Sequence, residues 1–109
     1  MIAERYGVYL AALDPAVGRE IAKTRPVVVI SLDVLNRVLD TVVVCPLTTK
    51  LHPGWRSRLP VKCAGKPAEI AVDQIRTIST LRLVRKVDAI NPATAERLRH
   101  LIVEMYGVT

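Results

Sequence analysis

Short apolar segments separated by closely spaced turn signals limit most strongly how this chain folds. The segments are rich in valine, isoleucine and other residues that favour strands, and Pro, Gly and Asp recur between them. This pattern predicts many short strands, as in a small β-barrel. The predicted strands are Tyr6–Leu13, Arg25–Leu32, Thr41–Leu47, Leu59–Cys63, Ala68–Val72, Asp73–Ser79 and Val84–Ile90.

Helical signals are clearest at the end of the sequence. Asn91 is a good N-cap, Pro92 suits the first helical position, and Gly107 follows the last turn. Asp33 and Ser79 are expected to cap shorter helical turns. One face of the predicted C-terminal helix is apolar, with Ala95, Leu98, Ile102 and Met105 in line and Leu101 beside them. We therefore expect a single, mainly β (α+β) domain over residues 1–109, with an amphipathic helix packed on the sheet.

The balance of charged residues indicates which kind of partner the chain binds. Sixteen lysines and arginines stand against ten acidic residues, which gives a formal charge of +6. Such an excess favours a polyanion, although a lysine-rich surface produces a similar balance. Glu4 and Arg5 precede any apolar stretch, so no signal peptide is expected, and no segment is long enough to span a bilayer. The expected location is the cytoplasm.

Residues that serve metal or covalent chemistry are sparse. Cys45 and Cys63 are too few and wrongly spaced for a zinc site, and Cys45 is interpreted as a core residue. Paired carboxylates, a glycine-rich phosphate loop and a nucleophilic serine motif are also missing. The sequence therefore predicts no metal site and no cofactor.

Arg25 and Thr48 are the polar residues that strand geometry brings together. Arg25 stands directly before Pro26, which lacks an amide donor and is expected at the first position of a strand. If the second and third predicted strands pair as antiparallel neighbours, Arg25 and Thr48 lie equally far from the middle of their connection. They then meet at one end of the sheet.

The two longest irregular segments, residues 14–24 and 48–57, open at that same end. Rigid strands flanked by loops are a common setting for a binding site, which makes the Arg25 and Thr48 pair a candidate. A structural role is the alternative, with Arg25 paired to Glu20 and Thr48 capping a loop. His52 is either a general base or a solvated loop histidine.

Four stretches give the chain a family likeness. They are DPAVGRE (14–20), RPVVVIS (25–31), VVVCPLTT (42–49) and DQIRTIS (73–79). In their order, their spacing and the length of the chain, they resemble the MazF/PemK (Kid) family of toxin endoribonucleases. The resemblance implies an SH3-like barrel of the MazF, Kid and CcdB type, which usually forms homodimers.

The same resemblance implies a site that cuts single-stranded RNA at short sequence motifs without a metal. It assigns catalysis to Arg25 and Thr48, and it implies a role for Glu20 in the first loop. It also implies that Gln74 and Arg76 lie along the RNA path. Other residues expected to contact RNA are Thr49, Lys50, Arg56, Arg58 and Asp73.

The implied chemistry uses the 2′-OH of the RNA as the nucleophile. Arg25 is expected to neutralise charge on the phosphoryl oxygens, and Thr48 to donate a further hydrogen bond to them. The products are a 2′,3′-cyclic phosphate and a 5′-OH. The group that removes the 2′ proton is open between Glu20, His52 and Arg25, with Glu20 ranked first.

The resemblance further implies a MazE-like antitoxin whose acidic, disordered tail covers the basic groove of the dimer. Two other functions stay open from the residues alone. One is an RNA-binding barrel without catalysis, and the other is a gyrase poison of the same fold. Trp55 is expected either to stack on an unpaired base or to pack over one end of the barrel.

Overall fold

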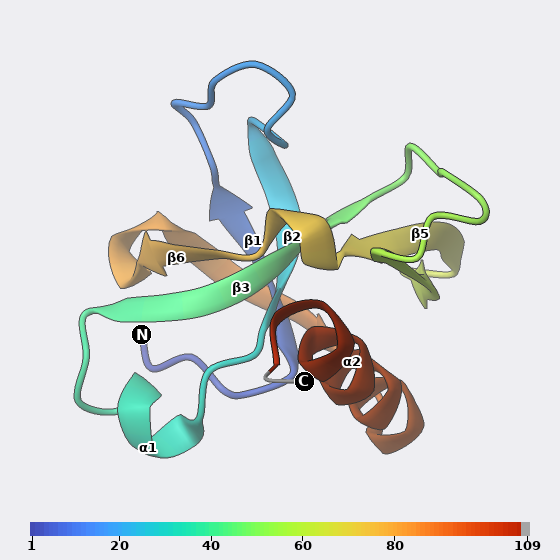
Figure 1. The fold of residues 1–109 in the computed structure, drawn as a ribbon. Helices are drawn as coiled ribbons and strands as arrows, with labels where there is room; N and C mark the ends of the chain where they lie inside the picture. Colours follow the sequence, from blue (N-terminus) through green and yellow to red (C-terminus); the bar gives the residue numbers. More distant parts are fainter. Residues whose placement is uncertain (108–109) are drawn as a thin grey trace.

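Strand β3 (Thr41–Thr48) is the strand around which the sheet is arranged. In the computed structural model, which describes residues 1–107, it pairs antiparallel with three other strands. The described residues form a curled sheet of seven strands, with a C-terminal helix against one face (Figure 1). The remaining elements are β1 (Gly7–Ala12), β2 (Thr24–Val29), α1 (Asp33–Asn36), β4 (Arg58–Cys63), β5 (Lys66–Ala71), η1 (Val72–Gln74), β6 (Arg76–Ser79), η2 (Thr80–Arg82), β7 (Leu83–Ala89) and α2 (Pro92–Tyr106).

The order of the strands across the sheet is β4-β5-β3-β2-β1-β7, and β6 pairs with β3 beside β5. The predicted mainly β fold with a C-terminal helix is confirmed. Strand β2 begins at Thr24, so the prediction that Pro26 opens this strand is wrong. Proline is tolerated here because pairing between β2 and β3 covers Val27 to Val29 and stops before Pro26.

The predicted single strand Asp73–Ser79 is also wrong. Strands β5 and β6 both pair with β3, but the three-residue 3₁₀ turn η1 separates them and shifts their register on β3. Asp73 and Gln74 therefore lie on a turn, and the strand begins at Arg76. This turn lets their side chains reach loops on either side.

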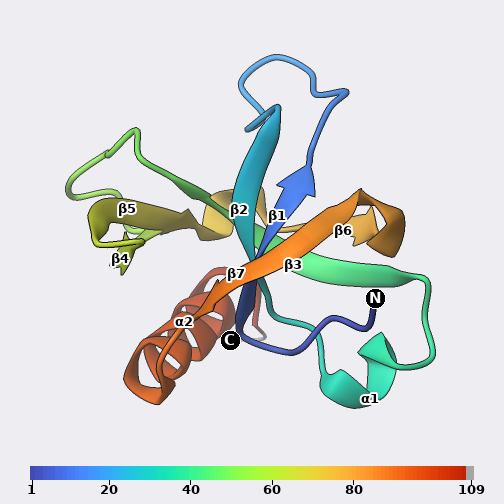
Figure 2. The same ribbon diagram turned by 180° about the vertical axis from the view of Figure 1, so that it is seen from behind.

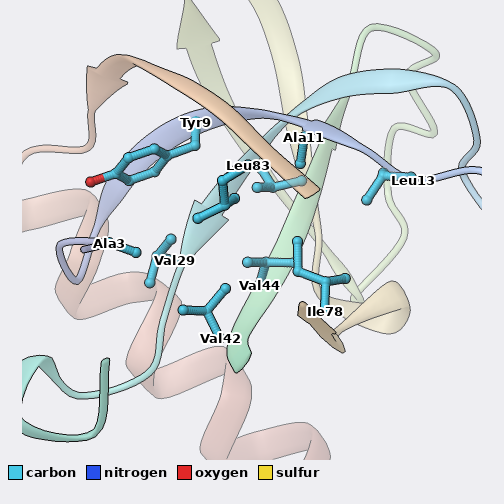
Figure 3. Packing of buried hydrophobic residues seen from close by; sticks show 10 residues of the cluster. Ala3, Tyr9, Ala11, Leu13, Val29, Val42, Val44, Ile78 and Leu83 are labelled. Atoms are coloured by element: carbon cyan, nitrogen blue, oxygen red, sulfur yellow. The ribbon is translucent and has the colours of Figure 1, made fainter. Parts of the chain in front are cut away.

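Both faces of β2 are buried, which explains its unbroken apolar run. Val27 and Val29 belong to a cluster inside the curl of the sheet, where Tyr9 and Leu83 also pack (Figure 3). Val28 points to the other face and joins the cluster that includes Leu98 of α2. All three valines are 0 % exposed. A strand covered on both sides reads as a continuous apolar run instead of alternating.

Two of the three predicted helix caps are confirmed. The side chain of Asn91 accepts a hydrogen bond from Thr94 N at 2.8 Å, and that of Ser79 accepts one from Leu81 N at 3.2 Å. The third is wrong, because Asp33 is the first residue of α1 and its carboxylate accepts from Arg5 N at 2.8 Å. Within residues 1–107, no helix has both the length and the apolar character to cross a membrane.

Burial of Leu98 tests whether α2 is held by the apolar cluster on its face of the sheet. Leu98 is 0 % exposed, so Leu98→Ala should lower the free energy of unfolding by about 2–5 kcal/mol in urea titrations. Leu81→Ala is the control, since Leu81 is 94 % exposed and its loss should change the free energy little. Equal effects of the two substitutions would contradict this packing.

Candidate active site

Arg25 and Thr48 lie together at one end of the sheet, as the strand geometry predicts. Val27 pairs with Pro46, and two residues further along each strand this register reaches Arg25 and Thr48. Both residues line a pocket of about 190 Å³. Its other walls are mainly apolar, from Pro26, Leu47, Thr49, Cys63, Ala64, Lys66 and Ala68. The pocket therefore joins a cation and a hydroxyl to an apolar surface.

Within residues 1–107 the Nη groups of Arg25 and the hydroxyl proton of Thr48 make no hydrogen bond to the protein. Arg25 is exposed, and its Nε donates to Ala22 O at 3.3 Å. Within residues 1–107 Arg25 has no ion pair, so the alternative of a pair with Glu20 is not found. The Oγ1 of Thr48 accepts from Lys50 N at 3.1 Å, which leaves the hydroxyl proton to donate elsewhere.

Glu20 lies in a second pocket, of about 400 Å³, rather than in that of Arg25 and Thr48. Its Oε1 accepts from Val17 N at 2.6 Å within the first loop. Asp73, Gln74 and Arg76 line the same pocket. The predicted catalytic residues are therefore divided between two separate pockets, Glu20 in one and Arg25 with Thr48 in the other.

Gln74 holds this first loop in place. Its side-chain oxygen accepts from Ile21 N at 2.7 Å, and its amide nitrogen donates to Arg19 O at 3.3 Å. At the base of the loop, Leu13 N donates to Lys23 O at 2.8 Å, and Lys23 N donates to Asp14 Oδ1 at 3.0 Å. The loop leading to Arg25 is thus closed at its base and tied to η1.

Arg58 was expected on the RNA-facing surface, and the structure buries it instead. Its side chain is 6 % exposed, and its Nε donates to Asp73 Oδ1 at 2.8 Å. Its Nη1 lies 3.7 Å from the carboxylate of Glu69, whose side chain is 5 % exposed. A guanidinium placed in this way has its main partners within the protein, although Arg58 also lines the pocket between β4 and α2.

Two opposing effects act on the pKa of Asp73. Partial burial raises it, but hydrogen bonds from Arg58 and Ser57 together with the charge of Arg58 outweigh the burial. The pKa of this carboxyl is therefore below its usual value. The ion pair with Arg58 favours the charged form.

The second loop carries a stacked pair of rings. The rings of His52 and Trp55 are 3.9 Å apart and nearly parallel, and the guanidinium of Arg58 lies 5.1 Å from the Trp55 ring. Trp55 remains 49 % exposed. His52 is therefore part of a stack rather than a freely solvated side chain. Trp55 packs on protein groups while keeping exposed surface.

The remaining predicted contacts are on the surface. Thr49 and Lys50 are exposed beside Thr48, and Thr49 lines the Arg25 pocket. The side chain of Arg56 is 88 % exposed and pairs with Glu104 of α2. Arg56 faces a pocket of about 460 Å³ between β4 and α2, away from Arg25.

Sequence reasoning missed Lys66, a second cation that lines the Arg25 pocket. It lies at the start of β5, beside the turn at Ala64 and Gly65. A lysine next to a glycine turn is a weak signal. Its position becomes clear only once the pairing of Thr48 with Glu69 shows that β5 runs alongside β3 at this end.

The cysteines are poor candidates for chemistry. Burial first, and then the charge of Asp73, raise the pKa of Cys45 to about 12, as suits a core thiol. Burial also raises the pKa of Cys63, which lines the Arg25 pocket. Among residues 1–107, no group of three His, Cys, Asp or Glu side chains is placed to hold a metal ion.

The curled β sheet, with two cations in a pocket between β2, the end of β3 and the β4–β5 turn, defines a small barrel of the toxin class. The chain belongs to the PemK-like, MazF-like toxins of type II toxin-antitoxin systems, whose family model matches residues 4–106. It is 37 % identical over 95 residues to endoribonuclease EndoA of Bacillus subtilis (strain 168). The aligned residues cover 80 % of this chain and 79 % of that protein. The family resemblance seen in the sequence is confirmed.

Solved structures share the fold. MazF from Deinococcus radiodurans superposes with a TM-score of 0.85 at 17 % identity, covering 99 % of each chain. A mycobacterial endoribonuclease, solved in complex with its cognate antitoxin, gives a TM-score of 0.78 at 19 % identity over 99 % of this chain and 96 % of that one. The barrel of the MazF type is confirmed.

The lowered pKa of Asp73 predicts how the stability of the fold depends on pH. Because this pKa is lower in the folded chain, the Asp73 charge stabilises the fold above about pH 4, the value expected in the unfolded chain. That stabilisation is lost as the pH falls through the lowered pKa. Asp73→Asn should therefore be less stable than the wild type at pH 7, and the difference should shrink below about pH 4.

Urea unfolding across this pH range measures the effect. Asp40→Asn is the control, since Asp40 is exposed and forms no salt bridge within the described residues. If the two variants follow the same pH dependence, the Arg58–Asp73 pair does not favour the charged carboxyl.

Proposed function

We propose that this chain is the toxin of a type II toxin–antitoxin pair and acts as a sequence-specific, metal-independent endoribonuclease on single-stranded messenger RNA. The observation that carries the proposal is the pocket in which Arg25 and Thr48 lie together, with Arg25 free of ion pairs within residues 1–107. The identity to a Bacillus subtilis endoribonuclease supports the reaction class. The excess of basic residues supports a polyanionic substrate.

The reaction uses a nucleophile that RNA supplies. The 2′-oxygen forms a bond to phosphorus as the bond from phosphorus to the 5′-oxygen breaks, which leaves a 2′,3′-cyclic phosphate and a 5′-OH. Arg25 neutralises the charge that develops on the phosphoryl oxygens, and the free hydroxyl proton of Thr48 donates to the same oxygens. Donors fixed at a strand end need little reorganisation during the reaction.

Glu20 is the group we assign to remove the 2′ proton. Its Oε1 accepts from Val17 N, whereas its Oε2 has no hydrogen bond within residues 1–107. The two alternatives are less available for this step. The ring of His52 is stacked on Trp55, and an arginine such as Arg25 stays protonated. The 5′-oxygen takes its proton from the solvent.

Exposed and half-buried side chains around the two pockets are the proposed contacts to the RNA strand. Thr49 and Lys50 directly follow Thr48, and Gln74 and Arg76 line the pocket of Glu20. The highly exposed Arg56 remains a predicted phosphate contact. Base stacking on the exposed part of Trp55 also remains a prediction.

An active ribonuclease needs a partner that restrains it. We place the chain in the cytoplasm as a homodimer with a MazE-like antitoxin, whose acidic tail suits a chain of charge +6. The mycobacterial structure with its cognate antitoxin supports such a partner. Self-association is supported by apolar side chains in residues 32–39 that are 44–74 % exposed; they are Leu32, Val34, Leu35, Val38 and Leu39.

Removing the Arg25 guanidinium tests the reaction directly. Arg25→Ala should slow the cleavage of a labelled single-stranded RNA by at least about 10²-fold, because charge on the phosphate is no longer neutralised. The free energy of unfolding should change by less than about 0.5 kcal/mol, since the side chain is exposed. Arg85→Ala, which changes an exposed arginine on β7, is the control and should cleave at the wild-type rate. A fully active, folded Arg25→Ala would refute the assignment.

The hydroxyl of Thr48 makes a second test. Thr48→Val keeps the shape of the side chain but removes the donor, and should lower kcat by about 10²-fold. Thr48→Ser keeps the hydroxyl and should retain most of the activity. Single-turnover cleavage rates at saturating enzyme separate this effect from binding. If Thr48→Val and Thr48→Ser react equally fast, the hydroxyl takes no part in the chemistry.

A further inference from the structure

Arg58 lies where three segments of the chain meet. It begins β4, its Nε donates to Asp73 Oδ1 on η1 at 2.8 Å, and its Nη1 faces the carboxylate of Glu69 on β5 at 3.7 Å. The side chains of Arg58 and Glu69 are 6 % and 5 % exposed. A buried charge is costly unless it is paired, so these three groups depend on one another.

One branch of this cluster leads to the first loop. Asp73 and Gln74 are neighbours on η1, and pairing with Arg58 fixes the position of that turn. Gln74 then accepts from Ile21 N at 2.7 Å and donates to Arg19 O at 3.3 Å. A change at Arg58 therefore reaches the loop that carries Glu20 and leads into Arg25.

The other branch leads to the second loop, between β3 and β4. Glu69 Oε1 accepts from His52 N at 3.0 Å, so the same carboxylate that faces Arg58 also holds this loop. Trp55 stacks on His52 and lies near the Arg58 guanidinium, and Arg58 N donates to Trp55 O at 3.2 Å. The two loops leave the sheet in different directions, the first at the top of the view and the second at its side (Figures 1 and 2).

We infer that Arg58 is a positioning residue, which holds the two loops in their places around Arg25 and Thr48 through Asp73 and Glu69. This inference rests on the proposed ribonuclease function. It replaces the expectation that Arg58 binds a phosphate of the RNA. Within residues 1–107 its Nη1 is buried without a hydrogen-bond acceptor, and its Nε donates to Asp73, so little of this guanidinium is open to a phosphate.

The conservative variant Arg58→Lys tests the inference. Lysine keeps the positive charge but cannot reach Asp73 and Glu69 in the forked geometry of arginine. We expect kcat for RNA cleavage to fall at least 10-fold with a smaller change in KM. We also expect the backbone amides of Ile21 and His52 to exchange with solvent at least 10-fold faster in the free protein.

Salt dependence separates this role from a phosphate contact. Loss of one contact to single-stranded RNA lowers the slope of log K against log salt by about 0.7, whereas a positioning residue leaves the slope unchanged. Arg58→Met, which has no charge to offer a phosphate, should therefore show the wild-type slope while both loop amides exchange faster. A slope reduced by about 0.7, with unchanged exchange at Ile21 and His52, would overturn the inference.

Two controls make the result specific. Val42→Ala creates a cavity in the core near the start of β3, and it should reduce global stability without accelerating the two amides relative to the rest of the chain. Gln74→Ala removes the acceptor of Ile21 N and shows how fast that amide exchanges when released. If the wild type cuts no RNA, the proposed function fails, but amide exchange in the Arg58 variants still decides whether the cluster holds the loops.

Discussion

Burial of strand β2 on both faces is the constraint on which the rest of the structure depends. Val27 and Val29 face the inside of the curled sheet, and Val28 faces the cluster beneath α2. Shifting the register of such a strand by one residue would move every side chain to the wrong face, so its alignment with β1 and β3 is strongly fixed. The fixed alignment of this run also fixes the backbone of the residues just before it. The backbone of Arg25, which precedes the apolar run on β2, is therefore held in a defined place.

The chain uses arginine in two opposite ways. Arg25 is exposed, and within the described residues it has no acidic partner, which leaves its donors to an incoming anion. Arg58 is buried between Asp73 and Glu69, so its donors are turned toward the protein. The same side chain thus serves as a binding group in one setting and as a structural tie in the other. Burial and the number of acidic neighbours separate these roles, and residue type does not.

What the sequence could predict was local, or followed from one short connection. The N-cap and the apolar face of α2 depend on residues close together in the sequence. The proximity of Arg25 and Thr48 follows from the length of the segment between β2 and β3. The break in the strand at η1 could not be predicted in this way, because it depends on how β5 and β6 each align with β3. The burial of Arg58 could not be predicted for the same reason. Its acidic partners lie 11 and 15 positions further along the sequence, and strand pairing brings them close.

The central claim is that this chain cleaves RNA by using the 2′-OH of the substrate, with charge stabilised by fixed side chains. The most direct measurement is to incubate the wild-type protein with a long single-stranded RNA in EDTA and to identify the chemical ends of the fragments. The account predicts cuts at one recurrent short motif, with a 2′,3′-cyclic phosphate on one side and a 5′-OH on the other. Fragments with 5′-phosphate ends, or intact RNA in the presence of a folded dimer, would contradict it.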